Sequence, residues 1–341
     1  MIEWVSKVII GFMRNFANPG ITARIFAKVC KAEGLDILYM RPRDVDMENN
    51  VVNGRLLVDS KWKRIKTELP RIIDISPYSL KNKELANYLR KNTYLTDNGM
   101  SGISKDRLQE LFGNDEQFSK YIIPSESVSS FNDILEFIDK YSEVVIKPID
   151  GLMGKGIYRV SKSDNMYVVG FKTSDAEYTE TAFKDFYEKN IAGKNHIIQK
   201  FINSRTAQDN PFDCRIHVEK NGLGKWEIAK MYVRIGIGQR VISNVNQGGG
   251  IADVKQFLTA NFPDKTKVIL KNLKDFGNAF PYKIEEIRNT ELMTLGMDVG
   301  IDKNGDLYLF EANTLPSVAN LRAEAALLRC EYYKYLIKNK I

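Results

Sequence analysis

Runs of apolar residues alternate with amphipathic stretches along the first hundred residues, which predicts a small domain of strands and helices. Apolar runs that fit buried strands cover residues 7–13, 37–40 and 71–76. Residues 19–33 have helical spacing, and Gly34 supplies a stop signal. A strand, a helix and a strand in this order favour a parallel sheet. Residues 51–62 predict a hairpin that turns at Asn53-Gly54, and we expect the domain to span residues 1–100.

The rest of the chain predicts two further units of mixed helix and strand, residues 101–202 and 203–341. Helical patterns cover residues 105–112, 131–141, 182–190, 253–261, 265–280, 283–295 and 317–338. Strand patterns cover residues 144–146, 157–160, 166–171, 196–202, 214–219, 226–234 and 306–311. Residues 119–125 are expected to be extended, and Asn221-Gly222 predicts a hairpin turn. The predicted fold class is α/β of the α+β kind.

A lysine stands at the end of one predicted strand, directly before a glycine-rich loop. The β-branched residues 144–146 favour the strand, and Pro148 after Lys147 weakens regular pairing. A buried ammonium is costly unless an anion meets it. The loop contains three glycines that allow close backbone approach to a ligand, Gly151, Gly154 and Gly156. This arrangement suits nucleotide phosphates, and the alternative is a hairpin whose lysine reaches solvent. The G-x-x-G-x-G order is neither a P-loop nor a dinucleotide fingerprint.

Three oxygen-bearing side chains near the end of the chain are predicted to converge. Asp298 lies on one predicted strand, and residues 303–306 form a turn into the next. Glu311 and Asn313 lie two residues apart at the end of that second strand, so their side chains share a face. Oxygen donors on adjacent strands suit Mg²⁺, which usually takes few protein ligands plus phosphates. The ligand spacing beyond Gly305 excludes an EF-hand, and a hairpin with solvated acids is the alternative.

The composition is that of a globular protein with a basic balance. Fifty Lys and Arg against 43 Asp and Glu give a net charge of +7, which suits anionic ligands. Nucleic acid is the rival ligand, but the basic residues are scattered and no zinc-finger or RNP-type pattern occurs. Cys30, Cys214 and Cys330 are few and far apart, which indicates reduced thiols in the cytoplasm. The presence of only two histidines weighs against a His/Cys zinc site, and residues 8–13 are too few to span a bilayer.

Taken together, the strand lysine, the glycine-rich loop, the later aspartate and the final Glu-x-Asn resemble the ATP-grasp family of carboxylate–amine ligases. The resemblance covers residues 100–325, and residues 8–74 resemble the small N-terminal domain of that family. Four segments look most like the endospore-coat-associated branch, namely residues 212–218, 234–236, 246–250 and 310–317. The resemblance implies an ATP-grasp fold, in which two α+β subdomains grip ATP after a small parallel α/β domain.

The resemblance assigns nucleotide-binding roles to the second unit. Lys147 looks like the lysine that binds the α- and β-phosphates. Lys105 looks like the other nucleotide lysine of the family, although a solvated helix lysine explains it nearly as well. The loop over the phosphates would contribute Gly151, Gly154, Lys155 and Gly156. The hinge whose backbone reads adenine would consist of Gln199, Lys200, Phe201 and Ile202.

The resemblance places the chemistry in the third unit. Arg215 looks like an arginine near the γ-phosphate, and Arg234 looks like one that holds an acyl-phosphate. Asn244 and the turn at residues 248–250 would line the acceptor side. The residues that look like the metal ligands of the family are Asp298, Glu311 and Asn313. The implied cofactors are ATP and Mg²⁺.

Two residues depart from the pattern of the related ligases. Lys200 stands where many of them carry an acid that helps to read adenine, which puts the base contact and the preference for ATP over GTP in doubt. Ile242 stands where some glutamyl ligases carry an arginine, so their acceptor chemistry does not transfer to this chain.

In family terms, Mg-ATP phosphorylates a substrate carboxylate, and an amine then attacks the acyl-phosphate to give an amide, ADP and phosphate. The partners would be small-molecule or peptide carboxylates and amines, with neither nucleic acid nor a membrane, and a homodimer is one expected assembly. Two other classes stay open, a kinase of the same fold and a non-catalytic nucleotide-binding or coat-assembly protein. The complete metal set weighs against the last class, because a non-catalytic protein is free to lose Glu311 or Asn313.

Overall fold

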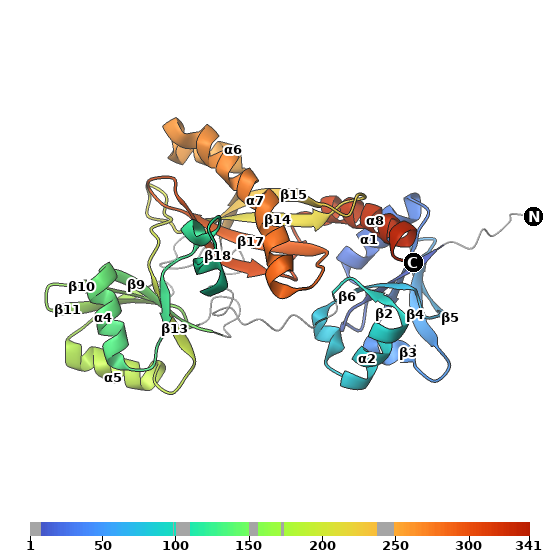
Figure 1. Ribbon diagram of the computed structural model, residues 1–341, viewed down its shortest axis with the longest axis horizontal. Helices are drawn as coiled ribbons and strands as arrows, with labels where there is room; N and C mark the ends of the chain where they lie inside the picture. Colours follow the sequence, from blue (N-terminus) through green and yellow to red (C-terminus); the bar gives the residue numbers. More distant parts are fainter. Residues whose placement is uncertain (1–7, 98, 100–109, 150–155, 172–173, 237–248) are drawn as a thin grey trace, which may run out of the picture.

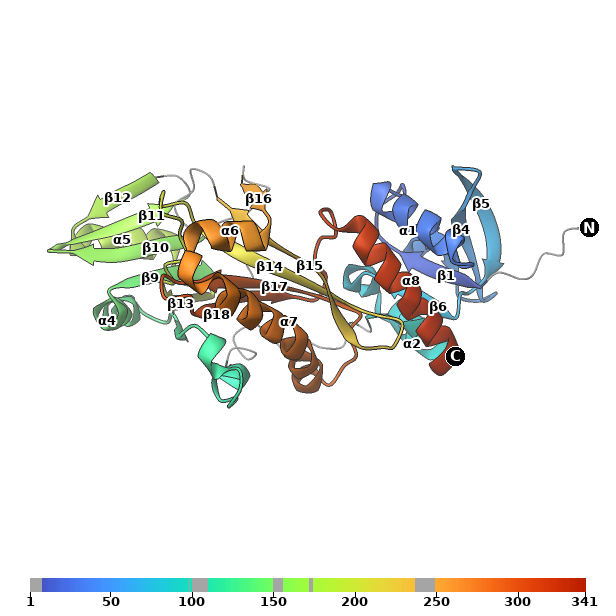
Figure 2. The same cartoon turned by 90° about the horizontal axis from the view of Figure 1, so that it is seen from above.

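The computed structural model describes residues 8–97, 99, 110–149, 156–171, 174–236 and 249–341 of the chain. Within these residues the strands form three separate sheets, of seven, six and five strands. Figures 1 and 2 show the three sheets in a row, with the third sheet in the middle and the first sheet at the end that carries the C-terminus. Helices cover the faces of these sheets, so the predicted α+β class is confirmed.

The first sheet contains the predicted parallel core. Its strands are β1 (Ile9–Met13), β2 (Asp36–Met40), β3 (Val45–Asp46), β4 (Val51–Val58), β5 (Lys61–Glu68), β6 (Ile72–Ile75) and β7 (Tyr94–Leu95). Strand β1 lies between β2 and β6 and runs parallel to both. Helix α1 (Ile21–Ala32) packs on one face, and α2 (Lys83–Asn92) packs on the other. Gly34 follows α1 with a φ of +85°, which confirms the predicted helix end.

The predicted turn at Asn53-Gly54 is wrong, because both residues lie inside β4. The chain turns instead at Asp59 and Ser60, which have φ values of 48° and 63°. Gly54 serves close packing: a Cβ at this position would lie 2.7 Å from the side chain of Leu38 on β2. An Asn-Gly pair is a strong turn signal, but here tertiary contact explains the glycine.

The second sheet is antiparallel throughout. It consists of β8 (Ser125–Ser127), β9 (Glu143–Pro148), β10 (Tyr158–Ser163), β11 (Met166–Phe171), β12 (Ser174–Tyr178) and β13 (His196–Lys200), in the order β12-β11-β10-β9-β13-β8. Helices α4 (Phe131–Tyr141) and α5 (Glu180–Asn190) cover one face. The predicted helix over residues 131–141 is confirmed, and Ser130 and Asp133 form its capping box. The predicted extended segment at residues 119–125 is partly wrong, because Ser119–Tyr121 forms a 3₁₀ turn.

The third sheet is also antiparallel. Its strands are β14 (Phe212–Lys220), β15 (Trp226–Ile235), β16 (Gly250–Ala252), β17 (Thr294–Ile301) and β18 (Leu307–Asn313), in the order β16-β15-β14-β17-β18. Helices α6 (Val254–Asn261) and α7 (Thr266–Arg288) cover one face. The predicted hairpin between β14 and β15 is confirmed, although Gly224 and not Gly222 takes the positive φ, at 69°.

The prediction of two helices at residues 265–280 and 283–295 is wrong. A single helix, α7, runs through Pro281, and residues from Thr294 onward form β17. Proline inside a helix costs stability because it removes a backbone hydrogen bond. Phe276, Phe280 and Ile284 of α7 are buried in the core of the third sheet on both sides of Pro281. This burial explains how the helix continues past the proline.

The last helix, α8 (Arg322–Asn339), packs the C-terminal end of the chain against the N-terminal domain. Ala325, Ala326 and Tyr333 of α8 share one hydrophobic core with Phe26 of α1 and with strands of the first sheet. Figure 2 shows α8 beside α1, between the first sheet and the hairpin of β14 and β15. The third predicted unit, residues 203–341, therefore ends in a helix whose core belongs largely to the first sheet.

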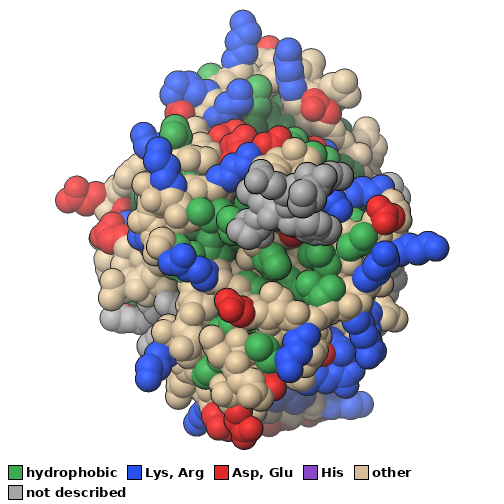
Figure 3. All heavy atoms as spheres, turned by 90° about the vertical axis from the view of Figure 1, so that its right-hand side faces the viewer, with side chains coloured by type: hydrophobic (Ala, Val, Ile, Leu, Met, Phe, Trp, Pro, Cys, Tyr) green, Lys and Arg blue, Asp and Glu red, His purple; other side chains and the backbone are tan. Residues whose placement is uncertain are grey.

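The surface at the end that carries the first sheet is mixed in character. Figure 3 shows Lys and Arg side chains spread around this face, with acidic side chains among them and hydrophobic side chains exposed near its centre. On this face the positive charge is thus dispersed, in keeping with the scattered basic residues of the sequence. Among the described residues, no helix combines the length and the apolar character needed to cross a membrane.

Candidate functional site

Strand β14 carries two kinds of side chain on its two faces. Phe212, Cys214, Ile216 and Val218 face the core formed with α6 and α7. The alternate residues are all charged or ionisable, and all are buried: Asp213, Arg215, His217 and Glu219. Because burying a charge is costly unless it is paired, this polar face needs partners from neighbouring elements. It divides into two clusters, one at each end of the strand.

The first group, called here the arginine–aspartate cluster, consists of Asp213, Arg215, Arg234 and Asp298. The register places Asp213 opposite Arg234 on β15, and Arg215 opposite Asp298 on β17. Arg234 donates from Nε and Nη2 to the two carboxylate oxygens of Asp213, both at 2.7 Å. Its Nη2 also lies 2.8 Å from Oδ2 of Asp298. Arg215 binds Asp298 through Nε and, at 3.0 Å, through Nη2.

The cluster balances two positive and two negative charges in a place that water hardly reaches. Asp213, Arg215 and Asp298 are each less than a tenth exposed. Burial alone would lower the pKa of Arg234, but the carboxylates of Asp213 and Asp298 outweigh it and raise that pKa above its usual range. The contacts with the aspartates hold both guanidinium groups in fixed orientations. Such fixed cations can offset negative charge that develops on a bound anion.

The three predicted metal ligands lie together at this end of the sheet. Asp298 pairs directly with Glu311 of β18, and Asn313 pairs with Gly296, two residues from Asp298. Directly opposed residues share a face of an antiparallel sheet, so the three side chains lie on the same face. Glu311 and Asn313 are half-buried. The structure thus brings together the three residues that the sequence singled out.

The donor set fits Mg²⁺ only as part of a larger coordination shell. No three His, Cys, Asp or Glu side chains among the described residues lie close enough to hold a metal by themselves. Asp298, Glu311 and Asn313 supply two carboxylates and one amide, and Mg²⁺ characteristically adds phosphate and water oxygens to such a small set. Asp298 already accepts hydrogen bonds from Arg215 and lies against Arg234. A metal at this point would share that carboxylate with the arginines.

On the second sheet, Lys147 lies on the face turned away from the helices. Its neighbours Val144 and Ile146 are buried against α4 and α5, so alternation puts Lys147 on the opposite face. It pairs with Ile197 of β13. Arg159 of β10 pairs with Val145 and shares this face. Its guanidinium forms an ion pair with Glu143 and lies 4.4 Å from the ring centre of Phe201, and the sequence alone gave no signal for it.

The predicted hinge at residues 199–202 directly follows this face. Gln199 is buried on β13, and Lys200 ends the strand. The backbone N–H of Lys200 donates to the carbonyl of Pro124 at 2.9 Å, and that of Phe201 donates to the backbone carbonyl of Glu143 at 3.0 Å. Both N–H groups thus already donate to backbone carbonyls of the protein. The adenine contact that the resemblance implies would have to use the remaining backbone groups or the side chains of Gln199, Lys200, Phe201 and Ile202.

Several predicted residues lie outside the described part of the chain: Lys105, Gly151, Gly154, Lys155 and Asn244. Gly156 is described, with a φ of +72°, and a Cβ there would lie 3.1 Å from Cγ of Pro148. This left-handed backbone is one that glycine adopts without strain.

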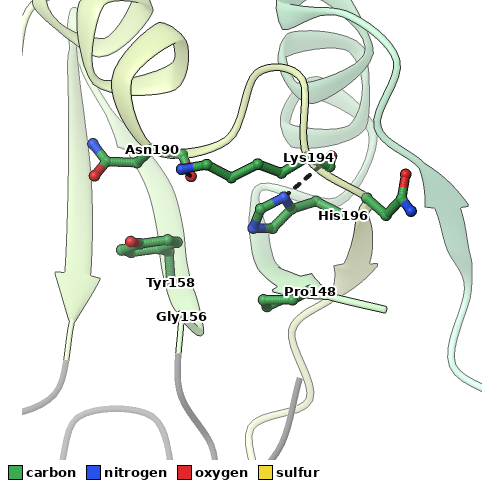
Figure 4. A pocket seen from close by; sticks show the side chains of 7 residues that line it. Pro148, Gly156, Tyr158, Asn190, Lys194 and His196 are labelled. Atoms are coloured by element: carbon green, nitrogen blue, oxygen red, sulfur yellow. Dashed lines mark hydrogen bonds between the residues drawn. The ribbon is translucent and has the colours of Figure 1, made fainter. Parts of the chain in front are cut away.

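A cavity of about 430 Å³ opens beside Gly156. Its lining residues are Pro148, Gly156, Tyr158, Asn190, Lys194, Asn195 and His196. Figure 4 shows them at the end of the second sheet, below the last turn of α5, with Nδ1 of His196 3.4 Å from the carbonyl oxygen of Lys194. Burial lowers the pKa of His196. Alternation places Pro148 on the face opposite to Lys147, so the cavity lies on the other side of the sheet from Lys147, although Gly156 of the predicted phosphate loop lines it.

The second group on the polar face of β14, called here the α8 cluster, was not predicted. It consists of Asp74, His217, Glu219, Thr294, Arg329 and Tyr333. Arg329 of α8 donates to both carboxylate oxygens of Glu219 at 2.9 Å, and its Nη1 lies 3.3 Å from Asp74 of β6. Asp74 also accepts from Arg14 at 2.7 Å. The α8 cluster therefore links the first sheet to the third.

The two buried acids of the α8 cluster stay ionised. Burial would raise their pKa values, but Arg14 and Arg329 hold the pKa of Asp74 below its usual range. Arg329 and His217 do the same for the pKa of Glu219. The alternation of ionisable and apolar residues along β14 was the sequence signal for a buried polar face. It did not indicate that the partners would come from β6 and α8.

The chain is similar in sequence to known proteins. A model of the YheC/D-like ATP-grasp family matches residues 94–338. The endospore coat-associated protein YheC of Bacillus subtilis (strain 168) is 22% identical over 330 residues, which cover 90% of either chain. The endospore coat-associated protein YheD of the same organism is 24% identical over 286 residues, which cover 80% of this chain but only 62% of YheD.

Solved structures agree on the fold. The ATP-grasp ligase PsnB, complexed with precursor peptide PsnA2 and AMPPNP, covers 97% of this chain and 98% of its own, at 8% identity and a TM-score of 0.55. A RiPP-associated ATP-grasp ligase of Chryseobacterium gregarium covers 96% of this chain and 97% of its own, at 12% identity and a TM-score of 0.50. The expected ATP-grasp fold is therefore confirmed. Because the family model matches well over half of the chain, this protein belongs to the YheC/D-like ATP-grasp family.

Proposed function

We propose that this protein is an ATP-dependent ligase that joins a carboxylate to an amine through an acyl-phosphate, releasing ADP and phosphate. The observation that carries the proposal is the arginine–aspartate cluster beside Glu311 and Asn313. It sets two fixed guanidinium groups next to a carboxylate and amide set on one face of the third sheet. Membership in the ATP-grasp family supports an ATP-dependent ligase.

The two arginines would bind the phosphoryl group that passes from ATP to the carboxylate. Arg215 would contact the γ-phosphate, and Arg234 would hold the acyl-phosphate while the amine enters. Each is oriented by a bidentate contact with an aspartate, Asp298 for Arg215 and Asp213 for Arg234. The protein then has little covalent work to do, because holding two anions together and neutralising their charge lowers the barrier.

Asp298, Glu311 and Asn313 would hold Mg²⁺ together with the nucleotide phosphates. When bound, Mg²⁺ would neutralise charge on the transferred phosphoryl group. Lys147 and the loop that contains Gly151, Gly154, Lys155 and Gly156 would contact the phosphates. The other nucleotide and acceptor residues of the proposal are Lys105, Gln199, Lys200, Phe201, Ile202 and Asn244.

Peptides are the first substrates to screen, because two structural neighbours are described with peptides bound. The test supplies the purified chain with Mg-ATP, candidate peptides and amines, and a carboxylate labelled with ¹⁸O. A ligase transfers one labelled oxygen to free phosphate, because the acyl-phosphate breaks between carbon and that oxygen. Mass spectrometry of the phosphate and of the product reads the result.

Two outcomes would contradict the proposal. A kinase that phosphorylates a hydroxyl group would leave the phosphoryl group on its product and move no label into phosphate. If ATP binds tightly but no carboxylate in a broad screen stimulates ADP release, the protein is a nucleotide-binding protein without ligase activity.

A further inference from the structure

Two of the three cysteines meet in the fold although they lie at opposite ends of the chain. Cys30 lies near the end of α1, and Cys330 lies in the middle of α8. Both belong to the core shared by these helices and the first sheet, and their exposed fractions are 0% and 1%. Cys214 is buried in the separate core of the third sheet. The molecule thus contains one thiol pair and one isolated thiol.

The two thiols contact each other directly. The thiol of Cys30 hydrogen-bonds to the sulfur of Cys330, which raises the pKa of Cys30 and lowers the pKa of Cys330. Lys334, one helical turn after Cys330, also lowers the pKa of Cys330. The cation of Lys334 therefore favours a thiolate in this pair, the form that attacks disulfides.

An ion pair at the surface lies beside the thiol pair. Nζ of Lys334 on α8 lies 2.6 Å from the carboxylate of Glu33, which caps the end of α1. Both side chains of this ion pair are about half exposed. Exposed ion pairs of this kind are weak, so local opening at this edge would let a small reagent reach the thiols.

We propose that Cys30 and Cys330 form a redox modification site, which closes a disulfide between α1 and α8 in the presence of a small-molecule disulfide. The Cys330 thiolate attacks the reagent, R–S–S–R, to form a mixed disulfide and release one thiolate, R–S⁻. The Cys30 sulfur, after losing its proton to solvent, then attacks the sulfur of Cys330 and releases the second R–S⁻. The two cysteines are oxidised by two electrons, and the reagent is reduced to two thiols.

The disulfide would hold α8, the helix that contacts both the first and the third sheet, in place. Arg329, adjacent to Cys330, and Tyr333, one turn later, are the α8 residues that bind Asp74 and Glu219. A covalent bond at Cys330 would hold these contacts against α1. Because the loop that it closes spans most of the chain, the bond also restricts the unfolded state strongly.

The test is direct mapping of the disulfide in the full-length wild-type chain. The reduced protein is incubated with oxidised glutathione, quenched with acid, unfolded in an alkylating reagent and digested without reduction. We expect a peptide that links Cys30 to Cys330, a chain mass lower by about 2 Da from the loss of two hydrogens, and Cys214 recovered as the alkylated residue. Dithiothreitol should reverse the change.

Two controls make the result decisive. The same reagent with the urea-unfolded chain should give linked peptides that include Cys214, which shows that pairing in the native chain follows the fold. Cys330→Ala should remove the intramolecular link, whereas Cys214→Ala should keep it. The oxidised wild type should unfold at a higher temperature than the reduced protein and should exchange the amide hydrogens of α8 more slowly.

Three outcomes would overturn the proposal. The first is a native chain whose three cysteines all remain reduced under conditions that oxidise the unfolded chain. The second is a native chain that gives only glutathione adducts, and the third is one that links Cys214 as often as the other two. The first would show that the pair is a sealed part of the core, as buried cysteines often are.

Discussion

Strand β14 offers a comparison within a few residues of chain, because its polar face carries two clusters that both contain buried arginine–carboxylate pairs. The arginine–aspartate cluster lies beside the half-buried Glu311 and Asn313. The α8 cluster at the other end is closed over by a helix whose Arg329 is buried together with Asp74 and Glu219. Only the arginine–aspartate cluster, which we propose as the functional site, has these half-exposed neighbours.

The comparison predicts that the α8 cluster governs stability and that the arginine–aspartate cluster governs turnover. A buried ion pair adds little net stability as a pair, but removal of one partner leaves the other charge buried and alone. In the α8 cluster such a loss has no compensation from a ligand. In the arginine–aspartate cluster the charges would also be balanced by the phosphates and the metal of the proposed reaction.

The largest expected effect is on stability. Arg329→Met keeps most of the side-chain volume but leaves the carboxylates of Asp74 and Glu219 without their shared cation. We expect a loss of about 3–5 kcal/mol in the free energy of unfolding, measured by urea denaturation. Lys338→Met on the exposed side of the same helix is the control, with a change within about 0.5 kcal/mol. Equal effects of the two variants would show that α8 does not depend on this cluster.

The next effect is on turnover. Glu311→Ala should lower ATP-dependent turnover by about 100-fold or more, because it removes a proposed metal ligand at the point where charge develops. The unfolding temperature should stay close to that of the wild type, since Glu311 is half-buried at the end of β18. Asp306→Ala, at an exposed position in the turn before that strand, should leave turnover unchanged. Near-normal turnover of Glu311→Ala would remove the metal assignment.

A smaller effect should connect Asp213 to Arg234. Asp213→Asn, Arg234→Gln and the double variant form a cycle whose coupling energy in urea denaturation we expect to be about 1–3 kcal/mol, given their two direct contacts. Asp213→Asn should also lower turnover by about 10-fold, because Arg234 would lose its orientation. Purely additive stability changes would mean that the pair is not coupled, whatever its geometry.

The smallest effect concerns acid. The pKa of Glu219 lies below its ordinary value of 4.5, mainly because Arg329 and His217 outweigh the cost of burial. A lowered pKa stabilises the folded state fully above the ordinary value, and this contribution disappears as the pH falls through the folded value. The stability difference between wild type and Glu219→Gln should therefore be largest above pH 4.5 and shrink below it. A difference that does not vary with pH would show that the charge of Glu219 contributes nothing.

Local patterns predicted most of the elements, and two of the errors share one cause. The capped helix at residues 131–141 and the parallel strands β1, β2 and β6 follow from spacing and end signals that act over a few residues. The turn at Asn53-Gly54 and the helix break at Pro281 failed because packing against Leu38 and against the core of the third sheet overrode strong local signals.

The sequence by itself determined the family and the residue set at Asp298, Glu311 and Asn313. Strand periodicity dictates which side chains share a face, and the register of β17 and β18 agrees with it. Only the tertiary structure decided the partners that come from distant segments. It brought Arg234 to Asp213 and Asp298, Arg329 to Asp74 and Glu219, and Cys330 to Cys30. A residue's spacing along one element reports its face, but which surface covers that face depends on how sheets and helices pack over the whole chain.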